Sequence, residues 1–91
     1  MEVLQTAIFR KKIKKLHANE KKLLDKAVRS ILNNPNIGES KKGDLAHIYI
    51  YKYKMISALT LIAYEFSDAR LILLNIGTHE NFYKELKNQR N

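Results

Sequence analysis

The stretch that decides the fold is residues 45–77, LAHIYIYKYKMISALTLIAYEFSDARLILLNIG, in the second half of this 91-residue chain. Its first part, residues 45–54, alternates isoleucine on one side with tyrosine on the other, as an extended strand does. Residues 59–66 and 71–76 are apolar on both sides and rich in β-forming residues, which is typical of buried strands. Residues 67–69, Ser-Asp-Ala, form a tight connection. We therefore predict three consecutive strands in an antiparallel meander.

The N-terminal part predicts a short strand and a first helix. Residues 1–5 can form the strand, after which Thr6 offers a side-chain oxygen to cap the helix. Phe9, Ile13 and Leu16 follow at the spacing of one helical face. The remaining positions of this segment are mostly lysine and arginine, so the helix is basic wherever it is not buried.

A second helix follows after a short turn that contains His17. Asn19 caps this helix in our interpretation, and Asn33, Asn34 and Pro35 end it. Its apolar positions form one stripe: Leu23, Leu24, Ala27, Val28, Ile31 and Leu32. Two such helices joined by a short turn predict an antiparallel helical hairpin.

A last helical turn closes the chain. Gly77 ends the third strand of the meander, Thr78 can cap the turn, and Phe82 and Leu86 are four residues apart on one face. The predicted order is β-α-α-β-β-β-α, a single α+β domain over residues 1–91. The helical hairpin must cover one face of the antiparallel sheet. The other face, if nothing covers it, is a basic and tyrosine-rich surface.

Charge is the most informative feature of the composition. Seventeen Lys and Arg stand against nine Asp and Glu, which gives a net charge of +8. Such a field favours polyanionic partners such as nucleic acid, an acidic protein segment or anionic lipid, and solubility alone is the plainer explanation. The absence of cysteine excludes disulfides, thiol catalysis and cysteine-based metal sites. Because the three histidines lack ligand spacing, we expect no metal and no cofactor.

Hydropathy gives an expectation about location. The N-terminus has no apolar run long enough for a signal peptide, and no stretch approaches the length of a membrane span. The longest apolar block, residues 56–64, is interrupted by Ser57 and Thr60. We expect a cytoplasmic protein without a membrane partner.

Four short motifs, in order, resemble those of the RelE/ParE superfamily of toxins. Residues 43–45 (GDL) followed by 51–54 (YKYK) are similar to the entry into that family's second strand. Residues 61–64 (LIAY) are similar to its third-strand core motif. Residues 77–83 (GTHENFY) are similar to its terminal motif, above all to the ending of the YafQ-like ribonucleases. The segment 6–16 fits the family's first helix, so the resemblance spans nearly the whole chain.

The resemblance implies the toxin of a type II toxin–antitoxin pair. RelE-like members cut mRNA, usually on the ribosome, whereas ParE-like members inhibit DNA gyrase and have no nuclease site. We favour a metal-independent endoribonuclease, and a gyrase inhibitor or a nucleic-acid-binding protein without catalysis remain alternatives. The implied partner is a small, acidic, partly disordered antitoxin. The toxin is then a monomer when free and part of a hetero-oligomer with its antitoxin.

His79 is the leading catalytic candidate. Metal-free RNA cleavage needs a base for the 2′-hydroxyl, an acid for the leaving 5′-oxygen and cations for the developing charge, and only histidine titrates near neutrality without perturbation. The resemblance to YafQ-like toxins puts His79 at the catalytic histidine, whereas position alone favours a capping or surface residue. Tyr83 is four residues further on and can orient the phosphate, stack on a base or simply pack the last helix.

Lys52 and Lys54 complete the predicted catalytic set, because they share a strand face and resemble phosphate-binding lysines of the family. Two solvated lysines are the alternative. Further contacts to nucleic acid are predicted for six residues: Lys11, Lys12, Lys41, Lys42, Tyr51 and Arg70. One departure weakens the nuclease prediction, because Leu61 stands where many RelE-like members carry arginine. The stabilising cation must then be lysine, which lacks the bidentate guanidinium.

Overall fold

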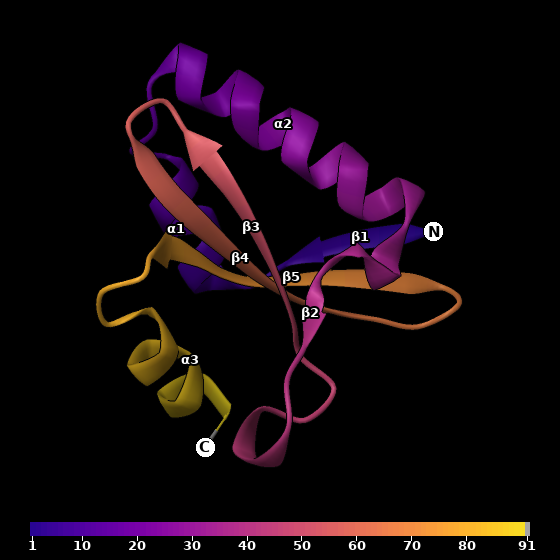
Figure 1. Ribbon diagram of the computed structural model, residues 1–91. Coiled ribbons are helices and arrows are strands. Elements are labelled where there is room, and N and C mark those ends of the chain that lie inside the picture. The colour runs from indigo at the N-terminus through magenta and orange to yellow at the C-terminus, as the bar shows by residue number, and fades with distance from the viewer. Residues whose placement is uncertain (91) are drawn as a thin grey trace.

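The structure is a computed structural model that describes residues 1–90 (Figure 1). The major elements and two short 3₁₀ turns follow one another along the chain: β1 (Glu2–Gln5), α1 (Ala7–Ile13), α2 (Ala18–Asn33), η1 (Pro35–Ile37), β2 (Glu39–Ser40), η2 (Gly43–Leu45), β3 (Tyr49–Met55), β4 (Ala58–Phe66), β5 (Arg70–Thr78) and α3 (Phe82–Arg90). The predicted α+β class and order are confirmed, with β2 as an additional strand too short to leave a periodic pattern.

The five strands form one sheet in the order β1-β5-β4-β3-β2. The predicted antiparallel meander is confirmed by β3, β4 and β5, in which Lys52 lies opposite Leu61 and Leu61 opposite Gly77. β1 departs from the purely antiparallel sheet, because it pairs parallel with β5, with Leu4 opposite Ile72. The chain returns to β5 only after both helices and three strands, and this long connection permits the parallel pairing.

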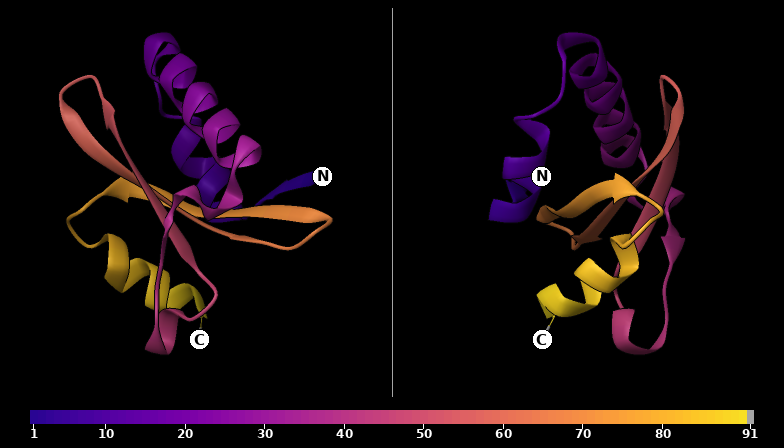
Figure 2. Two further views of the ribbon diagram at one scale, coloured as in Figure 1. Left: turned by 45° about the vertical axis from the view of Figure 1, so that its right-hand side comes forward. Right: turned by 90° about the vertical axis from the view of Figure 1, so that its left-hand side faces the viewer.

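The helical hairpin covers one face of the sheet, as predicted, and α3 covers part of the other face, whose cover the sequence analysis left open (Figures 1 and 2). Phe9 of α1 and Ile31 of α2 pack with β4 and β5 in one buried cluster. Phe82 and Leu86 of α3 pack with Leu61 and other residues in a second cluster on the opposite face. β4 is apolar on both sides, and each side therefore needs its own cover.

The tyrosines of β3 lie on the face covered by α2, which corrects the prediction of a tyrosine-rich outer surface. Tyr49, Tyr51 and Tyr53 are half-buried and pack against the cluster built by α1 and α2. Burial is the largest of the causes that raise the pKa of Tyr53 to about 12. The alternate residues Lys52 and Lys54 are exposed on the other face. Successive side chains of β3 point to opposite faces of the sheet, so the tyrosines pack on one face and the lysines are exposed on the other.

Two helix boundaries differ from the predictions. The N-cap of α2 is His17 rather than Asn19, because the Glu20 carboxylate reaches back to accept a hydrogen bond from the His17 amide at 2.9 Å. Thr78 does not cap α3, because the pairing of β5 with β4 extends to Thr78 itself. α3 begins at Phe82, directly after Asn81, whose φ of 60° breaks the extended chain.

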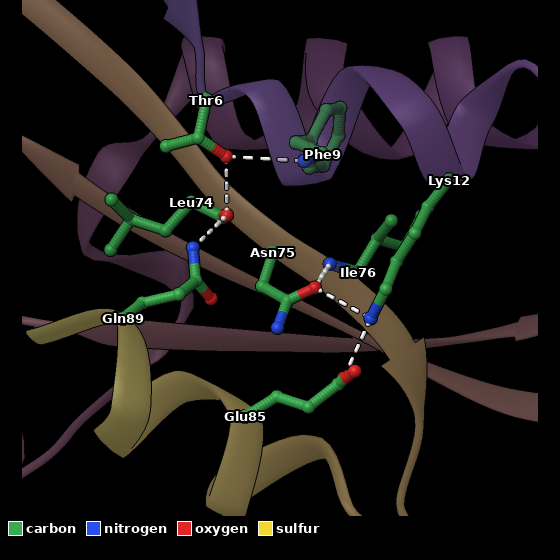
Figure 3. A network of polar contacts seen from close by, with 8 residues as sticks. All are labelled: Thr6, Phe9, Lys12, Leu74, Asn75, Ile76, Glu85 and Gln89. Atoms are coloured by element: carbon green, nitrogen blue, oxygen red, sulfur yellow. Dashed lines mark hydrogen bonds and ion pairs between the residues drawn. The ribbon is translucent and has the colours of Figure 1, made fainter.

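Polar side chains join α1, β5 and α3 along the edge of β5 that β1 does not cover (Figure 3). β1 covers only the first part of β5, so backbone groups further along need other partners. The Leu74 carbonyl accepts hydrogen bonds from Thr6 Oγ1 and Gln89 Nε2. Lys12 Nζ donates to Asn75 Oδ1 at 2.8 Å and to Glu85 Oε1 at 2.7 Å. Lys12 is therefore a brace between the sheet and α3.

Replacing Lys12 by methionine is expected to lower the free energy of unfolding by about 0.5–1.5 kcal/mol, because two hydrogen bonds to the ammonium disappear. The hydrogen bond from Lys12 lowers the pKa of Glu85 below its ordinary 4.5. A carboxyl group whose pKa is lower in the folded state than in the unfolded state stabilises the folded state at pH values above its unfolded pKa. This contribution is lost as the pH falls through the folded pKa. Urea unfolding should therefore give a lower free energy of unfolding for Lys12→Met than for the unmodified chain at pH 7. The difference between the two proteins should be smaller below about pH 4.

The matched control for this prediction is Lys11→Met, which removes an exposed cation from the same helix. Equal effects of both substitutions across the pH range would contradict a brace at Lys12.

Candidate functional site

His79 and Tyr83 meet at the junction of β5 and α3. Their rings lie 5.5 Å apart between centroids, at 73° to each other. Residues 79–81 are not helical, so the turn before α3 rather than helical spacing makes this contact. Phe82 anchors the junction, because it is buried against the sheet and touches the Tyr83 ring edge-on at 5.3 Å. The imidazole of His79 is exposed and free to meet a substrate.

Lys41 extends this pair from the other edge of the sheet. Its Nζ lies 5.2 Å from the centre of the Tyr83 ring, a cation–π distance. The same ammonium forms an ion pair with Glu39 at 2.5 Å. The hydrogen bond with Glu39 raises the pKa of Lys41 above its ordinary value. Lys41 is therefore a permanent cation at neutral pH and suits charge stabilisation rather than proton transfer.

A shallow groove of about 290 Å³ lies beside Tyr83. The chain lines it with residues of the β2–β3 connection and of α3: Lys41, Lys42, Asp44, Leu45, Tyr83 and Lys87. Gly43, with φ of 67°, allows the connection to turn back toward α3. Three of the six lining residues are lysines, so the groove suits an anionic group such as a phosphate.

Lys52 and Lys54 lie on the same face of the sheet as α3. Lys52 is two strands from Gly77, a separation of about 10 Å across the sheet. Its charge also acts on Glu39, whose pKa is lowered chiefly by its hydrogen bond with Lys41 and further by Lys52. Lys54 lies further along β3, toward the β3–β4 turn. The predicted strand lysines therefore share a face with the site, and the charge of Lys52 reaches Glu39, the ion-pair partner of Lys41.

Three predicted nucleic-acid contacts lie away from this site, and a fourth, Lys12, is bound within the fold beside Gly77. Tyr51 packs under α2 on the opposite face, with its ring centre 6.1 Å from that of Tyr53. Arg70 is at the far end of β5, where it pairs with Glu2 at 3.3 Å. Lys12 is held by Asn75 and Glu85, as described above. Lys11 is exposed on α1, and no contact joins it to the site within the described residues. The structure does not bring these residues together with His79 and Tyr83, because sheet pleat and strand length separate them, and their contacts with nucleic acid stay predictions.

Several residues of the site were not predicted from the sequence. Lys87 is four residues after Tyr83, a helical spacing that gave a usable signal. Glu39 lies in β2, and this strand of two residues is too short for a periodic pattern to reveal it. Tyr64 supports the site indirectly from the core. Its hydroxyl donates a hydrogen bond to the Pro35 carbonyl at 2.6 Å and accepts one from the Gly38 amide at 3.0 Å. It thereby holds the segment that leads to Lys41.

Solved structures share this fold. A mutant of the E. coli toxin RelE in the free state has a TM-score of 0.72 at 18% identity, over 94% of this chain and 90% of that chain. The intact E. coli RelBE toxin–antitoxin complex gives 0.68 at 21% identity, over 87% and 96%. The YoeB/ParE toxin from Agrobacterium tumefaciens gives 0.69 at 18%, over 87% and 99%. No curated protein matches this sequence significantly. The fold is thus that of the small RelE/ParE toxins.

A family model identifies the chain more closely. The model of the ParE-like toxin of type II bacterial toxin–antitoxin systems matches residues 3–87. The chain belongs to this family, and the resemblance to the RelE/ParE superfamily that its motifs indicate is confirmed. Within residues 1–90, no helix is long and apolar enough to cross a membrane.

Proposed function

We propose that this toxin is an endoribonuclease that cleaves mRNA without a metal ion and so arrests translation. The contact between His79 and Tyr83 beside a lysine-lined groove carries this proposal. A titratable imidazole, an aromatic hydroxyl and fixed cations are the groups that RNA transesterification requires. We place its action in the cytoplasm, on mRNA bound to ribosomes, where an arrest of translation takes effect.

The chemistry follows from the positions of these groups. The 2′-hydroxyl of the substrate attacks the adjacent phosphorus, and the 5′-oxygen leaves, which yields a 2′,3′-cyclic phosphate and a 5′-hydroxyl. His79 accepts the proton of the 2′-hydroxyl or donates one to the leaving 5′-oxygen, because it is the exposed imidazole beside the groove, and solvent water exchanges the proton at the other oxygen. Lys41, Lys42 and Lys52 neutralise the charge that develops on the phosphate. Tyr83 positions the phosphate through its hydroxyl or stacks on a neighbouring base.

The proposed regulatory partner is a cognate antitoxin. The RelE relatives include a complex with RelB and a complex with a RelB peptide. A disordered, acidic segment that folds on binding fits a toxin of net charge +8. We propose that the free toxin is a monomer and that the antitoxin converts it into an inactive hetero-oligomer.

Inhibition of DNA gyrase is the second candidate, and the family model itself favours it, because that model describes ParE-like toxins. Leu61 adds to this reading, since it is fully buried where many RelE-like members carry an arginine. A supercoiling assay with purified gyrase separates the two functions. Inhibition that survives the loss of both His79 and Tyr83 supports the gyrase function.

The direct test of the nuclease is to express the chain without an antitoxin and to map RNA ends. New ends within coding regions, with 5′-hydroxyl and cyclic-phosphate chemistry, are the expected result. Purified protein should cleave RNA equally well with and without EDTA. Growth arrest without new mRNA ends overturns the proposal.

Replacing Lys41 by glutamine is expected to lower kcat/KM for RNA cleavage about 10-fold or more, about 1.4 kcal/mol of transition-state stabilisation. The reason is the loss of the cation that contacts the Tyr83 ring and lines the groove. A short fluorogenic RNA provides the assay. Lys84→Gln is the matched control, since Lys84 is an exposed cation on α3 outside the groove. Equal activity of the two variants would contradict the role given to Lys41.

A further inference from the structure

Glu39 is a carboxylate that stands among the cations of the candidate site. Its Oε1 accepts a hydrogen bond from Lys41 Nζ at 2.5 Å. The short strand β2 places it there, because Glu39 lies opposite Ile50 of β3, and Ile50 is buried in the cluster under α3. Opposed residues of an antiparallel pair point to the same face of the sheet. Glu39 therefore lies on the face that carries the candidate site.

Two lysines flank this carboxylate along that face. Lys41 is two residues after Glu39, and its amide continues the pairing by donating to the Ile48 carbonyl at 2.9 Å. Lys52 is two residues after Ile50, so it is a diagonal neighbour of Glu39, about 7–8 Å away between backbone positions. The hydrogen bond from Lys41 and the charges of both lysines lower the pKa of Glu39, which is therefore an anion at neutral pH.

The two partners of the ion pair differ in their exposure to solvent. The side chain of Glu39 is 60% exposed, whereas that of Lys41 is 23% exposed. The Lys41 ammonium also lies 5.2 Å from the centre of the Tyr83 ring, inside the site. An anion from solution can thus reach the place of the carboxylate, while the ammonium stays where it is.

We propose that Glu39 is an internal counter-anion that competes with RNA phosphate for Lys41 and Lys52 and so weakens the binding of RNA. The proposal rests on the proposed function for its ligand, a single strand of RNA. A phosphate that binds both lysines either displaces the carboxylate from Lys41 or meets a like charge beside it. Exposed ion pairs are weak, so a phosphate can displace this carboxylate. One acidic residue then sets the affinity of a cationic site.

A positioning role for Glu39 is the opposing explanation, in which the carboxylate holds Lys41 over the Tyr83 ring. Two observations favour competition. The backbone of Lys41 is fixed by its hydrogen bond to Ile48, and the Tyr83 ring gives its ammonium a second partner. Lys52 lies within the seven-residue strand β3, which fixes its backbone without help from Glu39.

The test compares Glu39→Gln with Glu2→Gln in the full-length chain, with His79 and Tyr83 unchanged. Glu2 is a matched control, because it is a strand glutamate of 59% exposure that pairs with Arg70 away from the site. Both substitutions change the net charge equally. The probe is a short, fluorescent, single-stranded 2′-O-methyl RNA, which has no 2′-hydroxyl to attack and stays intact. Fluorescence anisotropy measures Kd, and thermal unfolding verifies that both variants fold.

Glu39→Gln should lower the Kd for this RNA about 3- to 10-fold, the effect of one charge a few ångströms from a phosphate in water. Glu2→Gln should lower it less than about 2-fold. When Lys41→Gln is already present, Glu39→Gln should give a smaller gain, because one of the two contested cations is gone.

Three results overturn the proposal. Weaker binding by Glu39→Gln supports the positioning role instead. Equal gains in Glu39→Gln and Glu2→Gln leave net charge as the whole explanation. A gain that Lys41→Gln does not reduce, or no binding of the probe by any of these proteins, removes the competition for Lys41. Because the probe is not cleaved, its Kd is independent of nuclease activity, and a failure of the nuclease proposal appears separately in the mapping of RNA ends.

Discussion

Replacing His79 by alanine is expected to reduce RNA cleavage by about 10²- to 10⁴-fold, the usual contribution of one general acid or base. The expected loss corresponds to about 3–5 kcal/mol of transition-state stabilisation. The imidazole is exposed at the end of β5, and its ring contacts only Tyr83 among the described ring pairs. The substitution should therefore remove chemistry and leave the free energy of unfolding nearly unchanged. The measurement is single-turnover cleavage of a short RNA, beside urea unfolding.

A second histidine supplies the control for this experiment. His17 is exposed at the N-cap of α2, and asparagine is a good N-cap residue, so His17→Asn removes an imidazole without loss of the cap. Cleavage by this variant should equal that of the unmodified toxin. Full cleavage activity in His79→Ala would refute the role of His79. Growth arrest that persists in a variant without cleavage activity would instead direct attention to gyrase.

Replacing Tyr64 by alanine is expected to lower the free energy of unfolding by about 3–5 kcal/mol, because a fully buried aromatic side chain leaves a cavity in the core. Tyr64→Phe keeps the ring but removes the hydroxyl that joins the Pro35 carbonyl to the Gly38 amide. Its expected cost is smaller, about 1–3 kcal/mol, for the groups left without partners. Urea unfolding followed by circular dichroism measures both values.

The two Tyr64 variants should also differ in their effect on the site. Burial raises the pKa of Tyr64, so the hydroxyl stays protonated and donates to Pro35 at physiological pH. Without this tie the segment leading to Lys41 loosens, and Tyr64→Phe should lower RNA cleavage more than its small change in stability implies. Tyr49→Phe is the control, since Tyr49 stacks on Tyr64 but makes no such tie. Equal stability of Tyr64→Phe and the unmodified toxin would contradict this anchor.

Gly38 shows why this corner of the fold could not be predicted locally. Its φ is −74°, which any residue adopts, so backbone freedom is not what it provides. A Cβ at this position would lie 2.6 Å from the Tyr64 hydroxyl oxygen. Glycine is therefore required at position 38 because a larger side chain would collide with the Tyr64 hydroxyl. Tyr64 is 26 residues further along the chain, so no local pattern indicates this requirement.

The sequence predicted the chemistry of the individual site residues, but it did not predict which of them lie close together. The chemistry of His79, Tyr83, Lys41 and Lys42 follows from residue type and motif, and the structure brings these four together. Tyr51 has a base-stacking side chain, yet strand alternation turns it under α2. Sequence proximity to Lys52 therefore misleads for a residue on the opposite face of the same strand.

The sequence by itself determined the strands, the helical hairpin and the charge of this toxin. Alternation in β3, the apolar runs of β4 and β5 and the stripe of α2 are local patterns, and local patterns specify local backbone. Only the tertiary structure decided that β1 pairs parallel with β5, that α3 covers the second face, and that Lys12 braces the sheet while Lys41 joins the site. These outcomes depend on contacts between residues up to 73 positions apart, as between Lys12 and Glu85. Packing of both sides of β4 selects them, and no local propensity encodes that choice.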